Sequence, residues 1–146
     1  FKGSMASMVF HGFRQIKETG KIKLFKSCNP EYKDGEQLRD FVYVKDICSV
    51  ITWLLDNDNI SGLFNVGTGK AESFKALAEA TFLALDMEPN IEYIQMPEHL
   101  KEKYQYYTKA ETDKLRSFGY SRDFVPMHDA VTEYVVEYLA RNYDIF

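Results

Sequence analysis

Lys2 and Arg39 are the two cations whose positions in the sequence favour a chemical role. Lys2 precedes a helical pattern that Ser4 is predicted to cap, and the positive end of a helix dipole disfavours a charged lysine. Burial would lower the pKa of its amine further, towards values useful for proton transfer. Arg39 precedes a β-type run, where its planar guanidinium suits two phosphate oxygens. The alternatives are a solvated Lys2 near a chain end and a surface ion pair between Arg39 and Asp40.

The Gly67–Gly69 segment lies between a predicted strand and a predicted helix, as phosphate-binding loops do. It lacks the spacing of both nucleotide fingerprints, GxGxxG and GxxxxGK[ST], so a tight strand-to-helix connection is favoured. His11, His99 and His128 have no metal-ligand spacing with one another or with the cysteines. We therefore expect no metal site.

Ser4 and His11 are seven residues apart, which is two helical turns, so both side chains can face one cleft. Ordinary hydrogen bonding on a helix surface is the alternative. Tyr104, Tyr106 and Tyr107 can form an aromatic wall for a base or a sugar, with core or surface packing as the alternative. Neither a nucleophilic triad nor a carboxylate pair can be assigned from the sequence.

The elements that position these residues alternate between helices and strands, which indicates an α/β fold. Hydropathy and capping patterns predict helices that begin near Ser4, Asp46, Ser73 and Met127, and strands at 21–25, 39–44, 63–66 and 91–94. Residues 27–37 contain two turn signals and are predicted to form an exposed loop. Because the strands are few and short, we expect part of the chain to dock onto a larger body. The chain opens on Phe1 rather than methionine, and we expect an upstream part to be missing.

Composition excludes several classes of protein. The 146 residues include 18 basic and 22 acidic side chains, a formal net charge of -4, which argues against a nucleic-acid-binding protein. No apolar run approaches the roughly 20 residues that span a bilayer, and no signal-peptide pattern is present. Two cysteines, Cys28 and Cys48, fit a reducing compartment better than a disulfide framework. We therefore expect a soluble, cytoplasmic protein without a membrane partner.

Several segments together resemble one enzyme family. KGSMAS at 2–7, RDFVYVKD at 39–46, FNVGTGKAESF at 64–74 and KYQ at 103–105 resemble the ADP-L-glycero-D-manno-heptose 6-epimerases. These are extended short-chain dehydrogenases/reductases. The second block and the start of the third are shared by many nucleotide-sugar epimerases and dehydratases, whereas the others are more specific. The resemblance covers essentially the whole chain.

The resemblance implies that residues 1–146 are the substrate-binding C-terminal part of such an enzyme. The fold class is then α/β, with a Rossmann-fold NAD(P)-binding domain beside a smaller substrate-binding lobe. The Rossmann glycine motif and the Tyr-x-x-x-Lys motif are absent from this chain. We therefore expect the dinucleotide-binding part, and a catalytic tyrosine, to belong to a missing N-terminal part.

The activity implied by the resemblance is epimerisation of ADP-heptose at C6, in lipopolysaccharide core heptose biosynthesis. Bound NADP removes a hydride from the sugar and returns it to the other face, so no cofactor is consumed. Lys2 corresponds to a family lysine that acts as acid or base and contacts the cofactor. The family also forms homo-oligomers, reported as pentamers.

The resemblance also implies the substrate-binding residues. Ser4 and His11 would contact the substrate from the first helix, Arg39 would hold its diphosphate, and Tyr104 would contact the nucleotide-sugar. A Phe-Glu-Gly-Ser segment lines the family's pocket, and its equivalents here are Phe25, Lys26, Ser27 and Cys28. Three of these four positions depart from the family pattern, and the loop that follows is longer.

Two alternatives stay open at this point. One is another extended nucleotide-sugar enzyme, such as a 4-epimerase or a 4,6-dehydratase. The other is a free-standing, non-catalytic module that binds a nucleotide-sugar.

Overall fold

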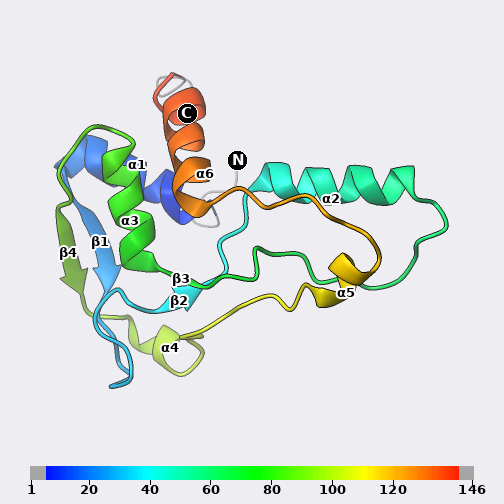
Figure 1. Ribbon diagram of the computed structural model, residues 1–146. Coiled ribbons are helices and arrows are strands. Elements are labelled where there is room, and N and C mark those ends of the chain that lie inside the picture. The colour runs from blue at the N-terminus through cyan, green and yellow to red at the C-terminus, as the bar shows by residue number, and fades with distance from the viewer. Residues whose placement is uncertain (1–5, 142–146) are drawn as a thin grey trace.

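The computed structural model describes residues 6–141, and three helices beside a parallel strand pair form its main body (Figure 1). The helices are α1 (Met8–Thr19), α3 (Phe74–Leu83) and α6 (Met127–Glu133), the last continued by the π-helical η2 (Tyr134–Leu139). The strands are β1 (Ile22–Phe25) and β4 (Ile91–Ile94), paired in parallel with Ile22 opposite Ile91 and Phe25 opposite Ile94. Both strands were predicted from their alternation of polar and apolar residues.

Two apolar clusters hold this body together. One lies among the helices and contains Val9, Phe10, Phe13, Leu77, Ala80, Met127, Val131, Val135 and Leu139. The other lies between α1, α3 and the strands and contains Ile16, Ile22, Leu24, Ala78 and Phe82. Burial of such side chains contributes about 1.5–3 kcal/mol each before entropy is counted. The predicted helix start at Ser73 is confirmed, because its hydroxyl caps α3 by accepting the Ala76 N–H at 3.0 Å.

Helix α1 begins later than predicted. Its N-cap is Ser7, whose hydroxyl accepts the Phe10 N–H at 3.2 Å, and it ends at Gly20, with φ of 70°. Ser4 is therefore not the cap. Lys2 and Ser4 themselves lie outside the described residues.

A second, smaller sheet lies beside the main body. In it β2 (Leu38–Arg39) pairs antiparallel with β3 (Glu72–Ser73). The segment 106–108 lies on the other side of β2, where the Leu38 N–H donates to the Tyr106 carbonyl at 2.9 Å. Of the predicted strand 39–44 only Arg39 lies in a strand, and residues 63–66 form no strand.

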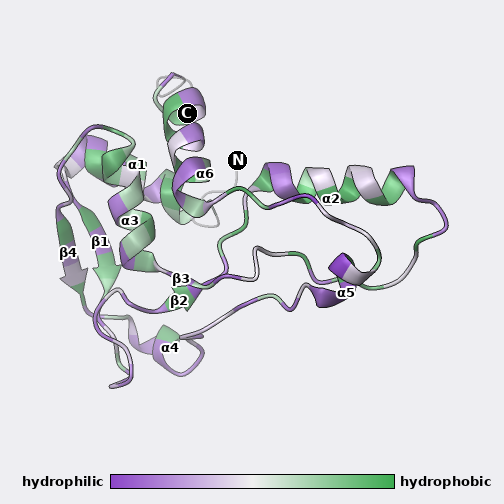
Figure 2. Cartoon of the chain, in the orientation of Figure 1, coloured by the Kyte–Doolittle hydropathy of each residue, from purple (hydrophilic) through white to green (hydrophobic). Residues whose placement is uncertain are grey.

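Helix α2 (Val44–Asp56) projects away from the main body towards α5 (Asp113–Ser117) (Figure 1). Val50 packs with Leu115 and Tyr120, and Leu54 is partly buried against them, but two other residues of the apolar face predicted for this helix are exposed. Ile51 is 51% exposed, Leu55 77% and the nearby Leu63 85%. Figure 2 shows hydrophobic residues recurring along α2. The described residues therefore leave an apolar face without a cover.

Asp46 was predicted to cap α2, and this prediction is wrong. The helix begins two residues earlier, with Tyr43 at the N-cap position. Asp46 is instead buried in the first turn, where its carboxylate accepts the Val125 N–H at 3.1 Å. Burial raises its pKa above 3.8, although the bond from Val125 opposes the shift. Asp46 thus ties α2 to the segment that leads into α6.

The short helix α4 (Glu98–Lys101) follows β4. No helix within residues 6–141 has the length and apolar character required to cross a membrane.

Candidate functional site

Arg39 lies between two aromatic rings at the end of β2. Its guanidinium carbon is 5.7 Å from the centre of the Tyr104 ring and 5.8 Å from the centre of the Phe74 ring. One guanidinium nitrogen donates to the Leu38 carbonyl at 3.2 Å, and no described carboxylate forms an ion pair with Arg39. The alternative of a surface pair with Asp40 is therefore wrong. The cation is held by rings and keeps donors for an anion.

Phe25 and Tyr106 extend this site on either side of Tyr104. The Phe25 and Tyr104 rings meet edge to face with centres 6.5 Å apart, and those of Tyr104 and Tyr106 with centres 5.2 Å apart. Burial raises the pKa of the Tyr104 phenol above 10, although the positive charge of Arg39 opposes the shift. At neutral pH this phenol keeps its proton and can donate a hydrogen bond beside the cation.

The backbone N–H groups of residues 26–28 already have partners within the protein. The Lys26 N–H donates to the Ile94 carbonyl at 2.8 Å, and the Ser27 N–H to the Asp34 carboxylate at 2.8 Å. The Cys28 N–H donates to the Tyr106 hydroxyl at 3.1 Å. This segment can therefore line a binding site by its shape, but it has no free backbone N–H group at residues 26–28 to donate to a ligand.

The Asp40 carboxylate accepts hydrogen bonds from two other segments beside the site. It accepts the Thr68 N–H at 2.8 Å, the Thr68 hydroxyl at 2.6 Å, the Gly69 N–H at 2.9 Å and the Ala110 N–H at 3.0 Å. A Cβ on Gly67 would lie 2.8 Å from an Asp40 carboxylate oxygen and 2.5 Å from the Ala110 Cβ, so the approach requires glycine. Asp40 thereby joins the residue after Arg39 to two distant segments.

These contacts also decide between the two interpretations of the Gly67–Gly69 loop. The N–H groups of Thr68 and Gly69 point at Asp40, so they are not available to a phosphate. The loop is a tight connection, as the sequence favoured, but no strand precedes it at residues 63–66. Sequence reasoning treated Asp40 only as a partner for Arg39. The signal that could have revealed its role is an Arg-Asp pair followed by a Gly-Thr-Gly turn rich in backbone donors.

The predicted site residues are only partly brought together. Phe25, Arg39 and Tyr104 form one group, and residues 26–28 join it through Tyr106. His11 is half-buried on α1, with its ring 5.7 Å from that of Phe10, and no described contact joins it to Arg39 or Tyr104. The argument that Ser4 and His11 share a helical face also lapses, because α1 begins at Met8.

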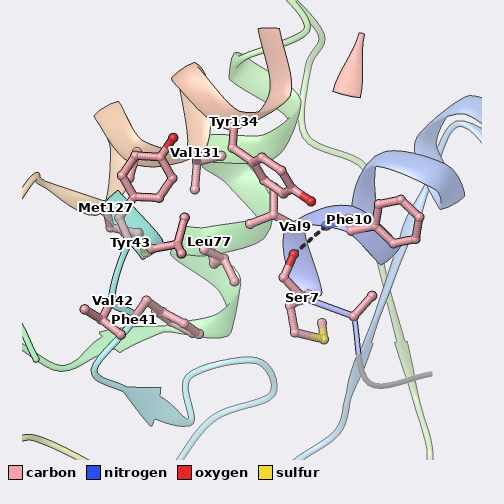
Figure 3. Close-up of a pocket in the computed structure, with 14 residues that line it drawn as sticks. Ser7, Val9, Phe10, Phe41, Val42, Tyr43, Leu77, Met127, Val131 and Tyr134 are labelled. Carbon is pink, nitrogen blue, oxygen red and sulfur yellow. Dashed lines mark hydrogen bonds between the residues drawn. The ribbon is translucent and has the colours of Figure 1, made fainter. Parts of the chain in front are cut away.

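An apolar hollow of about 630 Å³ lies between α1, the segment 41–44, α3 and α6 (Figure 3). Among the described residues, its lining contains none of the predicted substrate-binding residues and no charged side chain. Such a surface suits an apolar protein segment better than a sugar diphosphate. Across residues 6–141, no group of three or more His, Cys, Asp or Glu side chains is arranged to hold a metal ion.

The fold of the described residues is also found in solved nucleotide-sugar enzymes. Residues 1–67 match the NAD dependent epimerase/dehydratase family. A solved Bacillus anthracis dTDP-glucose 4,6-dehydratase in complex with NAD has the same fold, with a TM-score of 0.74 and 16% identity over 94% of this chain and 40% of that one. The predicted α/β fold of an extended short-chain dehydrogenase/reductase is confirmed.

Four curated relatives that are 43–52% identical to this chain share one name. The chain is 52% identical over 139 residues to an ADP-L-glycero-D-manno-heptose-6-epimerase of Nitratidesulfovibrio vulgaris, covering 95% of this chain and 43% of that relative. The crystal structure of the Helicobacter pylori enzyme of that name has a TM-score of 0.74 and 24% identity, covering 93% of this chain and 38% of that one. The resemblance stated from the sequence is confirmed. The chain spans less than half the length of the curated relatives it matches.

Proposed function

We propose that residues 1–146 are the substrate-binding part of an ADP-L-glycero-D-manno-heptose 6-epimerase. The enzyme would convert ADP-D-glycero-D-manno-heptose to its L-glycero epimer at C6, for lipopolysaccharide core heptose synthesis. The observation that carries the proposal is Arg39, a cation without an ion-pair partner among the described residues, held between the Tyr104 and Phe74 rings. The 52% identity to a relative of that name selects the sugar.

In this proposal Arg39 binds the diphosphate, because its planar fork can meet two phosphate oxygens at once. Tyr104, protonated at neutral pH, donates a hydrogen bond to the nucleotide-sugar beside that cation. Phe25 and residues 26–28 line the pocket by shape. His11 and Ser4 stay predicted contacts, and Lys2 stays the predicted acid or base.

The proposed cofactor is NADP, a nicotinamide dinucleotide that supplies transient oxidation of the sugar carbon. The described residues do not fit its pyrophosphate, because the Gly67–Gly69 donors are bound to Asp40. We therefore assign the dinucleotide to an N-terminal part outside this chain. That part would cover the apolar hollow and the exposed face of α2. Both surfaces are apolar, and their exposure to water is unfavourable.

The test is an assay of the full-length protein with ADP-D-glycero-D-manno-heptose, in which chromatography separates the two C6 epimers. We expect the same epimer mixture from either starting sugar. Turnover of a different nucleotide-sugar without C6 interconversion would instead indicate a 4-epimerase or a 4,6-dehydratase. Tight binding of an ADP-sugar by residues 1–146 alone, without cofactor, would favour a non-catalytic binding module.

Arg39→Ala is expected to weaken ADP-heptose binding by about 1.5–3 kcal/mol, the contribution of a charge-assisted contact. Isothermal titration of the full-length protein measures this as a rise in Kd of roughly 10- to 150-fold. Arg14→Ala is the matched control, because Arg14 forms an exposed ion pair with Glu18 on α1 and should leave Kd unchanged. An unaltered Kd for Arg39→Ala would remove the diphosphate role.

The proposal also includes a cytoplasmic location and a homo-oligomer, a pentamer by resemblance to the family. Light scattering of the full-length protein during size-exclusion chromatography measures its mass directly. A monomer in solution would contradict this part of the proposal without affecting the catalytic part.

A further inference from the structure

We propose that Tyr106 is a positioning residue, which sets the loop 27–36 against the Arg39 site and thereby tunes the binding of the nucleotide-sugar. The inference rests on the proposed function for its substrate. Its structural part gives Tyr106 a role that differs from the aromatic wall predicted for it from the sequence.

The loop is ordered by its own hydrogen bonds. The Asp34 carboxylate accepts the Ser27 N–H at 2.8 Å and so closes the loop across seven residues. Inside it, the Asn29 side chain accepts the Glu31 N–H at 3.0 Å, and the Asn29 carbonyl accepts the Tyr32 N–H at 3.1 Å. These bonds set the shape of the loop, but they do not place it relative to the site.

Tyr106 supplies that placement through two contacts. Its hydroxyl accepts the Cys28 N–H at 3.1 Å, and its ring lies 5.5 Å from the Tyr32 ring, tilted by 32°. One side chain therefore touches both the first and the middle part of the loop. Because the two contacts are of different kinds, removal of the hydroxyl and removal of the ring can be separated by substitution.

The other end of Tyr106 is attached to the Arg39 site. Its carbonyl accepts the Leu38 N–H at 2.9 Å, one residue before Arg39, and its ring lies 5.2 Å from that of Tyr104. Tyr104 in turn lies 5.7 Å from the Arg39 guanidinium carbon. A shift of the loop is thus transmitted by two adjoining rings to the group proposed to bind the diphosphate. Tyr106 acts through these neighbours and is not a catalytic residue.

The test compares Tyr106→Phe and Tyr106→Ala in the full-length protein, with Tyr107→Phe as the control. The sequence grouped Tyr107 with Tyr104 and Tyr106 in an aromatic wall, but only the last two are in ring contact. Tyr107 is 52% exposed and has no ring contact among the described residues. For Tyr106→Phe we expect faster amide hydrogen exchange confined to residues 27–36. We also expect a KM for ADP-heptose raised about three- to tenfold with kcat unchanged, as loss of one hydrogen bond predicts. Tyr106→Ala should raise KM further, and Tyr107→Phe should change neither quantity.

Several results would overturn the proposal. Unchanged exchange in the loop would remove the positioning role, and exchange raised across the whole chain would make Tyr106 an ordinary structural residue. A looser loop with unaltered KM, or a lower kcat at constant KM, would remove its link to binding. If the wild-type protein does not turn over ADP-heptose, the proposed function fails. The exchange measurement still decides the role of Tyr106, because it needs no substrate.

Discussion

Asp40→Asn is expected to destabilise the fold by about 2–3 kcal/mol at pH 7, the cost of losing charge-assisted bonds and leaving a buried donor unpaired. The carboxylate accepts two bonds from Thr68, one from Gly69 and one from Ala110. An asparagine has a single acceptor oxygen, so in either orientation its NH2 group faces at least one backbone N–H. Urea unfolding of wild-type and variant protein measures the difference.

The pH dependence of this loss follows from the pKa of Asp40. Partial burial raises that pKa, but the hydrogen bonds from Thr68, Ala110 and Gly69 outweigh burial and hold it below 3.8. A carboxyl group with a lowered pKa in the folded state contributes stability above its unfolded pKa and loses it as the pH falls through the folded value. The difference in free energy of unfolding between the wild type and Asp40→Asn should therefore be largest at pH 7 and decrease only below about pH 4.

Asp46→Asn is the matched control, because Asp46 is the more deeply buried carboxyl group yet accepts a single bond. Burial raises the pKa of Asp46, so its negative charge is unfavourable in the folded state. The wild type therefore gains stability as the pH falls through this raised pKa. An asparagine oxygen can still accept the Val125 N–H, and we expect a change below about 1 kcal/mol at pH 7. Equal losses of stability for Asp40→Asn and Asp46→Asn would contradict the role assigned to Asp40.

The sequence predicted those parts of the fold that depend on local periodicity. β1, β4 and α3 appear where alternation, helical spacing and a serine cap indicated them. Local signals were less reliable at helix starts, where several polar residues compete for the cap. Ser7 rather than Ser4 begins α1, and Asp46 bonds to Val125 rather than capping α2. In the second case a partner 79 residues away determines the role of the side chain.

Expectations that depended on partners outside the described residues failed for another reason. Residues 63–66 have the composition of a strand, but no described strand pairs with them. Leu55 on α2 is exposed although its spacing predicts burial. A strand is stabilised by hydrogen bonds to its neighbours, so composition alone cannot form it. The cluster of Phe25, Arg39 and Tyr104 likewise could not be derived from spacing, because its members lie on segments far apart in the sequence. It entered only through the family resemblance.

Lys2→Ala is expected to lower the rate of C6 epimerisation by the full-length protein about 10²- to 10⁴-fold, the usual contribution of a positioned acid or base. Lys2 lies outside the described residues, and its role stays a prediction from the family resemblance. ADP-heptose binding should change little, because Arg39 is the residue proposed to bind the diphosphate. A kinetic assay that reports kcat and KM separately distinguishes the two roles.

Lys2→Arg separates proton transfer from charge. An arginine keeps the positive charge but does not release its proton at accessible pH, so it cannot replace an amine that acts as acid and base. We therefore expect Lys2→Arg to be as inactive as Lys2→Ala. If arginine restores turnover, Lys2 provides a positive charge alone. If Lys2→Ala itself has near-normal turnover, the lysine is a solvated neighbour, and another residue must transfer the proton.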